Sequence, residues 1–205
     1  AYAAVVARHF LAESQVDRAI VNVREHAWHP IDVAGAPAPD AFVRSGEGTR
    51  VATVAAARNE VTVEAGVEDL VVMKTTRSAF AGFPRDRFTT LAETDDRLMA
   101  TKLTAIWRYG PADLDFDATY ADVRRTLLER FADHDSPIVQ TSIWIMGQAI
   151  LERHEEVDEV RMVLPNLHHW TVDLSPFGIA NDKLVYVATT EPHGLIEATV
   201  RRSPG

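Results

Sequence analysis

Apolar and polar residues follow one another along this chain with two different periods, and each period predicts a different element. Ala1 to Ala12 have helical spacing, with apolar residues at Tyr2, Val5, Val6 and Phe10. Beyond a break near Ser14, Ala19, Val21 and Val23 alternate with polar residues, which is the period of a half-buried strand. The chain therefore opens with a helix, and a strand that continues towards Trp28 follows it.

The next stretch predicts further strands that are separated by turns. Its turn formers are Pro30, Gly35, Pro37 and Pro39, which favour an irregular connection. Two strand-like segments come after them, Phe42–Ala55 and Val61–Ala65, with a turn at Arg58-Asn59. This part of the chain predicts no second helix.

Residues from Val67 onward predict a fuller unit in the order strand, strand, helix, helix, strand, strand. The segments are Val67–Thr75, Leu98–Tyr109, Asp117–Phe131, Pro137–His154, Val157–Leu164 paired with His169–Leu174, and Lys183–Thr189 followed by Leu195–Val200. The first region has the order of the back half of this unit. We therefore divide the chain into residues 1–66, the back half of a first unit, and residues 67–205, a complete second unit. The order predicts an α+β fold with antiparallel sheets and helices on one face.

The first residue already lies in the predicted helix, and no capping side chain or Met precedes it. Natural helices usually begin at a residue whose side chain caps the first turn. We therefore expect the first unit to have an upstream part, supplied by the same or another polypeptide.

Composition narrows the function classes. The 205 residues are 46% hydrophobic and 25% charged, with a formal net charge of −9, so a nucleic acid or an anionic membrane is a poor partner. The absence of Cys excludes thiol catalysis and Cys-ligated zinc. No apolar run spans a membrane and no signal peptide is evident. The chain ends in Ser203-Pro-Gly205 rather than Ser-Lys-Leu, so we expect a cytoplasmic protein.

Common catalytic motifs are missing, and the most unusual polar segment is Val163–Trp170 (VLPNLHHW). In an extended chain, Asn166 and His168 share one face, and both can hydrogen-bond to a planar polar ligand. The alternative is an Asn turn with an incidental His. The adjacent pair His168-His169 would point to opposite faces of a strand, and we expect no metal site.

Two longer segments carry a resemblance to a known family. Met73–Phe83 (MKTTRSAFAGF), followed by Arg87–Thr101 (RFTTLAETDDRLMAT), closely resembles the central signature of the uricase (urate oxidase) family. Shorter blocks agree in order and approximate spacing: Val21–Val23 with Trp28, Ile138–Thr141 (IVQT), Leu164–His168, and Pro192–Ile196 (PHGLI). The resemblance covers nearly the whole chain.

The resemblance implies the tunnelling fold (T-fold), in which each chain has two ββααββ units and sheets join edge to edge into barrels. It also implies a homotetramer with active sites at subunit interfaces. Compared with the family's pattern, the first unit here lacks two strands and a helix at its start. We therefore expect the missing N-terminal segment to be a further partner.

For the substrate site, the resemblance implies that Phe80 stacks on the purine plane and that Arg97 holds the purine edge with its guanidinium fork. The alternatives are core packing for Phe80 and an ion pair with Asp95 or Asp96 for Arg97. In a chain of net charge −9, an anionic substrate needs a local cation of this kind.

The resemblance implies that the Val139 backbone N–H and the Gln140 side chain bind the opposite edge of the purine. Both lie at a predicted helix start, where free N–H groups favour an anion. Asn166 would help to hold dioxygen or water above the ring, and His168 would belong to the proton relay. The family's relay also uses a Lys and a Thr of the N-terminal unit, which we expect this chain to lack. The sequence therefore does not decide whether this chain is active by itself.

The implied reaction is the oxidation of urate by O₂ to 5-hydroxyisourate with release of H₂O₂, without a metal or organic cofactor. Two alternatives remain open at this point. The chain could be a non-catalytic purine-binding or scaffold subunit of the same fold. It could also be a zinc-dependent pterin-forming enzyme of that fold, which would need a set of three His ligands that no motif supports.

Overall fold

The strands that form the centre of the molecule pair in one antiparallel sheet. The computed structural model describes residues 1–44, 46–110, 114–189, 191 and 193–203. The sheet has six strands in the order β1-β4-β5-β6-β7-β10: β1 (Arg18–Glu25), β4 (Thr49–Ala57), β5 (Glu60–Lys74), β6 (Met99–Tyr109), β7 (Val157–Leu167) and β10 (Leu195–Arg201). Strands that are neighbours in the chain are therefore mostly neighbours in the sheet, as expected for short connections.

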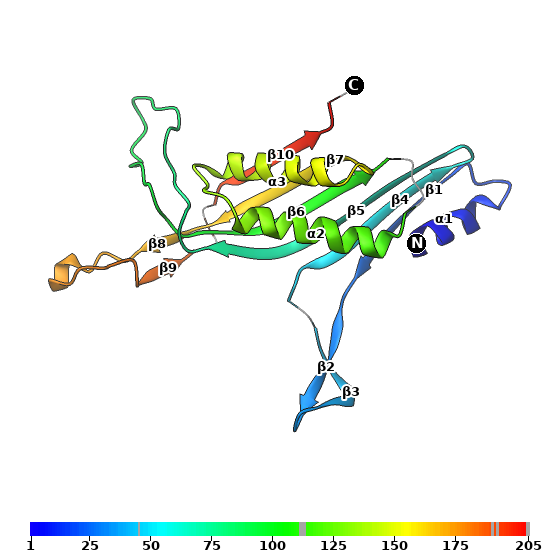
Figure 1. Ribbon diagram of the computed structural model, residues 1–205, viewed down its shortest axis with the longest axis horizontal. Helices are drawn as coiled ribbons and strands as arrows, with labels where there is room; N and C mark the ends of the chain where they lie inside the picture. The colour runs from blue at the N-terminus through cyan, green and yellow to red at the C-terminus, as the bar shows by residue number, and fades with distance from the viewer. Residues whose placement is uncertain (45, 111–113, 190, 192, 204–205) are drawn as a thin grey trace.

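Helices cover one face of this sheet (Figure 1). They are α1 (Tyr2–Leu11), α2 (Phe116–Ala132) and α3 (Val139–Arg153). Asp115 caps α2, because its side chain accepts from the backbone N–H groups of Asp117 and Ala118 at 3.0 and 3.1 Å. No side chain caps α3. The expected α+β architecture, with antiparallel strands and helices on one face, is confirmed.

The main core lies between α2, α3 and strands β5 to β7. Trp107, Leu127, Ile143 and Met162 are almost completely buried there. Gly147 lets α3 approach the sheet closely, since a Cβ at this position would lie 2.5 Å from Cγ2 of Val200 in β10. Burial of large apolar side chains stabilises this part of the fold at roughly 1.5–3 kcal/mol for each side chain.

The packing of α1 differs from the sequence prediction. The helix buries Ala3 and Ala7 against the small residues of β1 and β4, and it leaves the larger apolar side chains mostly outward. Tyr2, Val5 and Phe10 are 72%, 62% and 51% exposed. The spacing of the large apolar residues predicted the helix correctly. These residues do not form the face that packs on the sheet, because short side chains there allow the helix backbone to lie close to the strands.

One long strand replaces two predicted ones. We expected separate strands at Val61–Ala65 and Val67–Thr75, but β5 is continuous from Glu60 to Lys74. Its register shifts between Val67 and Leu70, where Asp69 has a φ of +60°, so a bulge interrupts the alternation without ending the strand. The proposed boundary between residues 66 and 67 thus falls inside β5, which pairs with β4 on one side and β6 on the other.

Two hairpins project from the sheet (Figure 1), and the pairing of the strands within each was not predicted. The connection expected to be irregular forms β2 (Trp28–Val33) and β3 (Ala36–Arg44), joined at Ala34 and Gly35, both with positive φ. The segment Phe42–Ala55, predicted as one strand, is divided between two, because β3 ends at Arg44 and β4 begins at Thr49.

The second hairpin pairs β8 (His169–Thr171) with β9 (Tyr186–Ala188), and a short 3-10 turn, η1 (Ser175–Phe177), lies between them. The predicted pairing of Val157–Leu164 with His169–Leu174 is wrong, because β7 pairs with β10.

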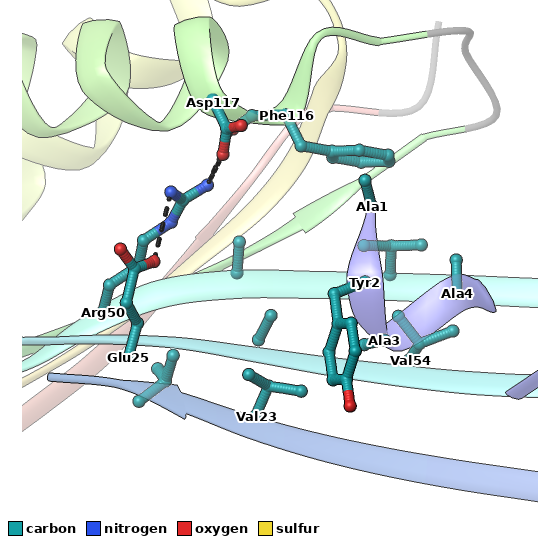
Figure 2. Close-up of a pocket in the computed structure, with 14 residues that line it drawn as sticks. Ala1, Tyr2, Ala3, Ala4, Val23, Glu25, Arg50, Val54, Phe116 and Asp117 are labelled. Carbon is teal, nitrogen blue, oxygen red and sulfur yellow. Dashed lines mark hydrogen bonds and ion pairs between the residues drawn. The ribbon is translucent and has the colours of Figure 1, made fainter. Parts of the chain in front are cut away.

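Arg50 of β4 connects the first region to α2. Its guanidinium lies 2.7 Å from an oxygen of Asp117 and 3.4 Å from one of Glu25. Dashed lines mark these two ion pairs in Figure 2. Beside these groups is a cavity of about 320 Å³ between the starts of α1 and α2, lined mainly by small apolar side chains such as Ala3 and Val54. None of the six residues predicted for the site lines this cavity.

Candidate active site

Four of the six predicted site residues line one cavity of about 570 Å³: Phe80, Arg97, Asn166 and His168. The loop between β5 and β6 supplies the first two, Asn166 lies near the end of β7, and His168 directly follows this strand. This loop and the β8–β9 hairpin project from the same end of the sheet (Figure 1). The volume lies within the range of small-molecule sites in proteins.

Backbone hydrogen bonds fix the two arms of the β5–β6 loop to each other. Phe80 and Thr94 exchange two hydrogen bonds, at 2.8 and 3.0 Å, and the N–H of Arg97 donates to the carbonyl of Ser78 at 2.7 Å. Phe80 and Arg97 are 17 positions apart in the sequence, yet the guanidinium carbon of Arg97 is 5.3 Å from the centre of the Phe80 ring. The loop therefore presents an aromatic face and a cation side by side.

Arg97 has no carboxylate within ion-pair distance among the residues that the structure describes. Its Nε lies 3.4 Å from the carbonyl oxygen of Ala79, and burial lowers the pKa of its guanidinium. Asp96 pairs instead with Lys183 of the β8–β9 segment, at 3.1 Å. The pairing of Arg97 with Asp95 or Asp96, the alternative from the sequence, is thus not what the structure has. A partly buried cation without a counter-ion suits an anionic ligand.

Phe80 lies outside the main core. Its ring stacks on Phe83, with the ring centres 4.5 Å apart and the planes inclined by 23°. The side chain is partly exposed and lines the cavity, so core packing is not its main environment. A planar ligand could use the remaining face of the ring.

Asn166 and His168 lie on the same side of the extended chain, as the spacing predicted. The Asn166 Nδ2 is 3.5 Å from the His168 Nδ1, and the His168 ring stacks on Trp170 with centres 5.0 Å apart. Burial lowers the pKa of His168, and the positive charge of Arg97 lowers it further. The imidazole is therefore neutral at pH 7 and can accept a proton.

Val139 and Gln140 begin α3, as expected from Pro137, but neither lines the cavity as the structure describes it. The Val139 side chain is buried in the core, and Gln140 is exposed. The helix start is nevertheless tied to the site loop, because the N–H of Ala79 donates to the carbonyl of Ser136 at 2.7 Å.

Trp170 and Lys183 are among the lining residues that sequence reasoning did not assign to the site. Trp170 directly follows the His168-His169 pair, which was the one available signal. Lys183 lies outside the matching motifs, and it reaches the site because β8 pairs with β9, a pairing that was not predicted. Pro192, in the last of the matching blocks, lies outside the described residues.

The fold and the cavity define a class of protein: an antiparallel α+β scaffold whose loop ends form a cavity lined by an aromatic ring, a partly buried cation and an Asn–His pair. Comparison with known proteins identifies the family. The family model named Uricase matches residues 63–197. The chain belongs to the uricase family, and its fold is the T-fold of that family.

Individual relatives agree with this assignment. The chain is 48% identical to a uricase of Arthrobacter globiformis over 162 residues, which are 79% of this chain and 54% of that protein. It is 34% identical to a uricase of Dictyostelium discoideum over 204 residues, 98% of this chain and 71% of that one. The crystal structure of the Arthrobacter globiformis uricase superposes with a TM-score of 0.92 at 40% identity, covering 100% of this chain and 70% of that chain. The chain thus spans about half of the first relative in the sequence alignment and about two thirds of the others.

Two further observations concern metal binding and membrane-spanning segments. Within the described ranges, no group of three or more His, Cys, Asp or Glu side chains is arranged to hold a metal ion. No helix in the part of the chain that the structure describes is long and apolar enough to cross a membrane.

Proposed function

We propose that this chain is the substrate-binding part of a urate oxidase, which converts urate, O₂ and water to 5-hydroxyisourate and H₂O₂. The observation that carries the proposal is the convergence of Phe80, Arg97, Asn166 and His168 on one cavity in a chain of the uricase family. In this proposal urate stacks on Phe80 while the guanidinium of Arg97 binds an oxygen and a ring nitrogen.

The proposed chemistry needs no cofactor, because the substrate itself is made a good electron donor. A urate anion gives up electrons more easily than the neutral molecule, and Arg97 favours the anion through its uncompensated charge. His168, held neutral by burial and by Arg97, belongs to the group that accepts and returns protons. Asn166 supplies an amide that can hold dioxygen or water above the ring.

We place the second edge of the purine against the start of α3, with the Val139 N–H and the Gln140 amide as donors. The uncapped helix start supports this placement, since its first N–H groups favour negative charge. Because Val139 and Gln140 lie outside the cavity lining, this contact requires the ligand to extend beyond the cavity towards α3.

The assembly that we propose is a homotetramer with sites at subunit interfaces, in which a Lys and a Thr from an N-terminal segment complete the relay. The exposed apolar residues of α1 and of the β2–β3 hairpin support association, since Phe10, Trp28 and Val33 are each more than half exposed. A cytoplasmic location stays a prediction of the sequence. Light scattering on the purified protein tests the oligomer.

The test of function combines two measurements on urate. In air, the loss of the urate absorption band is followed together with peroxide release. Without oxygen, binding is measured by titration calorimetry. Loss of urate with one equivalent of peroxide supports the oxidase, and binding without urate loss supports the non-catalytic purine-binding alternative. Failure of both binding and turnover overturns the proposal.

A further inference from the structure

A chain of buried polar groups lies directly behind the site, at the junction of α2 and α3. The imidazole of His134 follows the last turn of α2, Ser136 lies in the connection, and Ser142 is in the first turns of α3. All three are buried, as is Lys74 at the end of β5. Buried polar groups cost stability unless they are hydrogen-bonded, and no part of the proposed reaction uses these residues.

The hydrogen bonds give this hydroxyl–imidazole chain a direction. The carbonyl of Arg130 can only accept, so the Nδ1 of His134 donates to it. The Nε2 of the neutral ring then accepts from the hydroxyl of Ser142, 2.8 Å away. Ser142 in turn lies 2.7 Å from the hydroxyl of Ser136 and can accept from it. Burial lowers the pKa of His134, which agrees with the neutral ring.

The charged groups around His134 also favour its neutral form. The ammonium of Lys74 donates to the carbonyl of His134 itself, and Arg77 adds a second positive charge from the site loop. The carboxylate of Asp135 acts in the opposite sense, but it pairs with Arg77. The hydroxyl–imidazole chain is therefore held in one protonation state and one tautomer at neutral pH.

The Ser136 end of this hydroxyl–imidazole chain contacts the loop between β5 and β6, which carries two of the proposed urate contacts. Ser136 and the site loop exchange two backbone hydrogen bonds, since the N–H of Ser136 donates to Arg77 at 2.9 Å and its carbonyl accepts from Ala79 at 2.7 Å. Ala79 immediately precedes Phe80. The hydroxyl of Ser136 also lies 3.9 Å from the sulfur of Met99, two residues after Arg97. Ser136 thus contacts the loop through its backbone and the first residue of β6, at the other end of the loop, through its hydroxyl.

We propose that the hydroxyl–imidazole chain of His134, Ser142 and Ser136 positions the urate site by fixing the start of α3 against the loop that carries Phe80 and Arg97. This inference rests on the proposed function. The three residues are then positioning residues: they do not touch the ligand, but they set the distance between the contacts on the loop and the contacts at the start of α3. A buried network with every member satisfied is well suited to holding two elements in one arrangement.

The test compares two deletions of a buried hydroxyl that is bonded to a buried histidine. Ser142→Ala removes the hydroxyl bonded to His134. The matched control is Thr126→Val, which removes the hydroxyl 3.3 Å from the Nε2 of His154; this pair joins α2 to the C-terminal cap of α3 and does not line the cavity. Both variants are expected to lose similar amounts of global stability in urea denaturation. A purely structural role predicts no further difference between them.

The positioning role predicts two differences. Under anaerobic conditions, Ser142→Ala should weaken urate binding by about three- to tenfold, the factor that corresponds to one lost hydrogen bond, whereas Thr126→Val should stay within about twofold of the parent. Hydrogen exchange in the ligand-free protein should become faster at the N–H groups of Ala79 and Arg97 in Ser142→Ala only. Ser136→Ala, at the other end of the chain, should act in the same direction.

Each outcome separates the two proposals. If the parent protein does not bind urate, the proposed function fails, and the exchange rates at Ala79 and Arg97 still decide whether the network holds the loop. If the parent binds urate but Ser142→Ala matches Thr126→Val in both affinity and exchange, the positioning role is wrong.

Discussion

Replacing Arg97 with Gln should separate the function of this residue from its contribution to stability. The variant removes the positive charge and keeps a side chain that can still donate a hydrogen bond. Arg97 is partly buried and has no counter-ion among the described residues, so its charge costs solvation in the free protein. Its side-chain hydrogen bond, to the carbonyl of Ala79, is long at 3.4 Å. We therefore expect the free energy of unfolding to stay the same or to rise slightly.

Binding should change in the opposite direction. A ring stacked on Phe80 lies next to the guanidinium, whose carbon is 5.3 Å from the Phe80 ring centre. Two unit charges about 4 Å apart interact by about 1 kcal/mol in water and by about 4 kcal/mol at the effective dielectric of a protein surface. Loss of the charge should thus weaken urate binding by roughly fivefold to several hundredfold.

Anaerobic calorimetry measures the affinity, and urea denaturation measures the stability. Arg85→Gln is the matched control, since Arg85 is an exposed residue of the same loop, and both variants remove one positive charge. The reasoning is refuted if Arg97→Gln binds urate as tightly as Arg85→Gln does. A loss of more than about 2 kcal/mol of stability would also contradict it, because it would make Arg97 a structural residue.

Three further outcomes follow from the packing and from the pKa shifts. Gly147→Ala should destabilise the protein by about 1–3 kcal/mol in urea denaturation, because the new Cβ would lie 2.5 Å from a methyl of Val200, and an unchanged midpoint would contradict this close contact. Burial lowers the pKa of His154 in the folded protein, so the neutral imidazole contributes stability above pH 6.5, and this contribution is lost as the pH falls through the folded-state pKa. Urea denaturation between pH 8 and pH 5 should show a falling free energy of unfolding. The fall should be smaller in His154→Gln. Phe80→Leu should weaken urate binding by several-fold in calorimetry while the melting temperature changes little, since the ring packs on Phe83 outside the main core.

The periodicity of apolar residues was sufficient to predict the elements of the fold that bury large side chains. Both helices over the main core begin and end within about two residues of their predicted limits, because their inner faces are strongly apolar. The β2–β3 hairpin escaped prediction because its prolines are typical of irregular chain. They are tolerated because this ribbon has only two strands, and each strand therefore has a free edge.

For the site, the family resemblance supplied residues that composition and spacing could not. Asn166 and His168 could be placed on one face from local geometry alone. The approach of Phe80 to Arg97 depends on the backbone pairing of Phe80 with Thr94, which no periodicity indicates. Lys183 reaches Asp96 across 87 positions of sequence, and contacts of that range require the tertiary fold.

The long strand β5 has a mechanical consequence. Its hydrogen bonds to β4 on one side and to β6 on the other run across the proposed unit boundary, so the two units share a paired strand and no loop separates them there. Pulling on the β1 edge would load the strands next to the proposed urate cavity directly. The whole sheet should therefore rupture in a single event under force, rather than unit by unit.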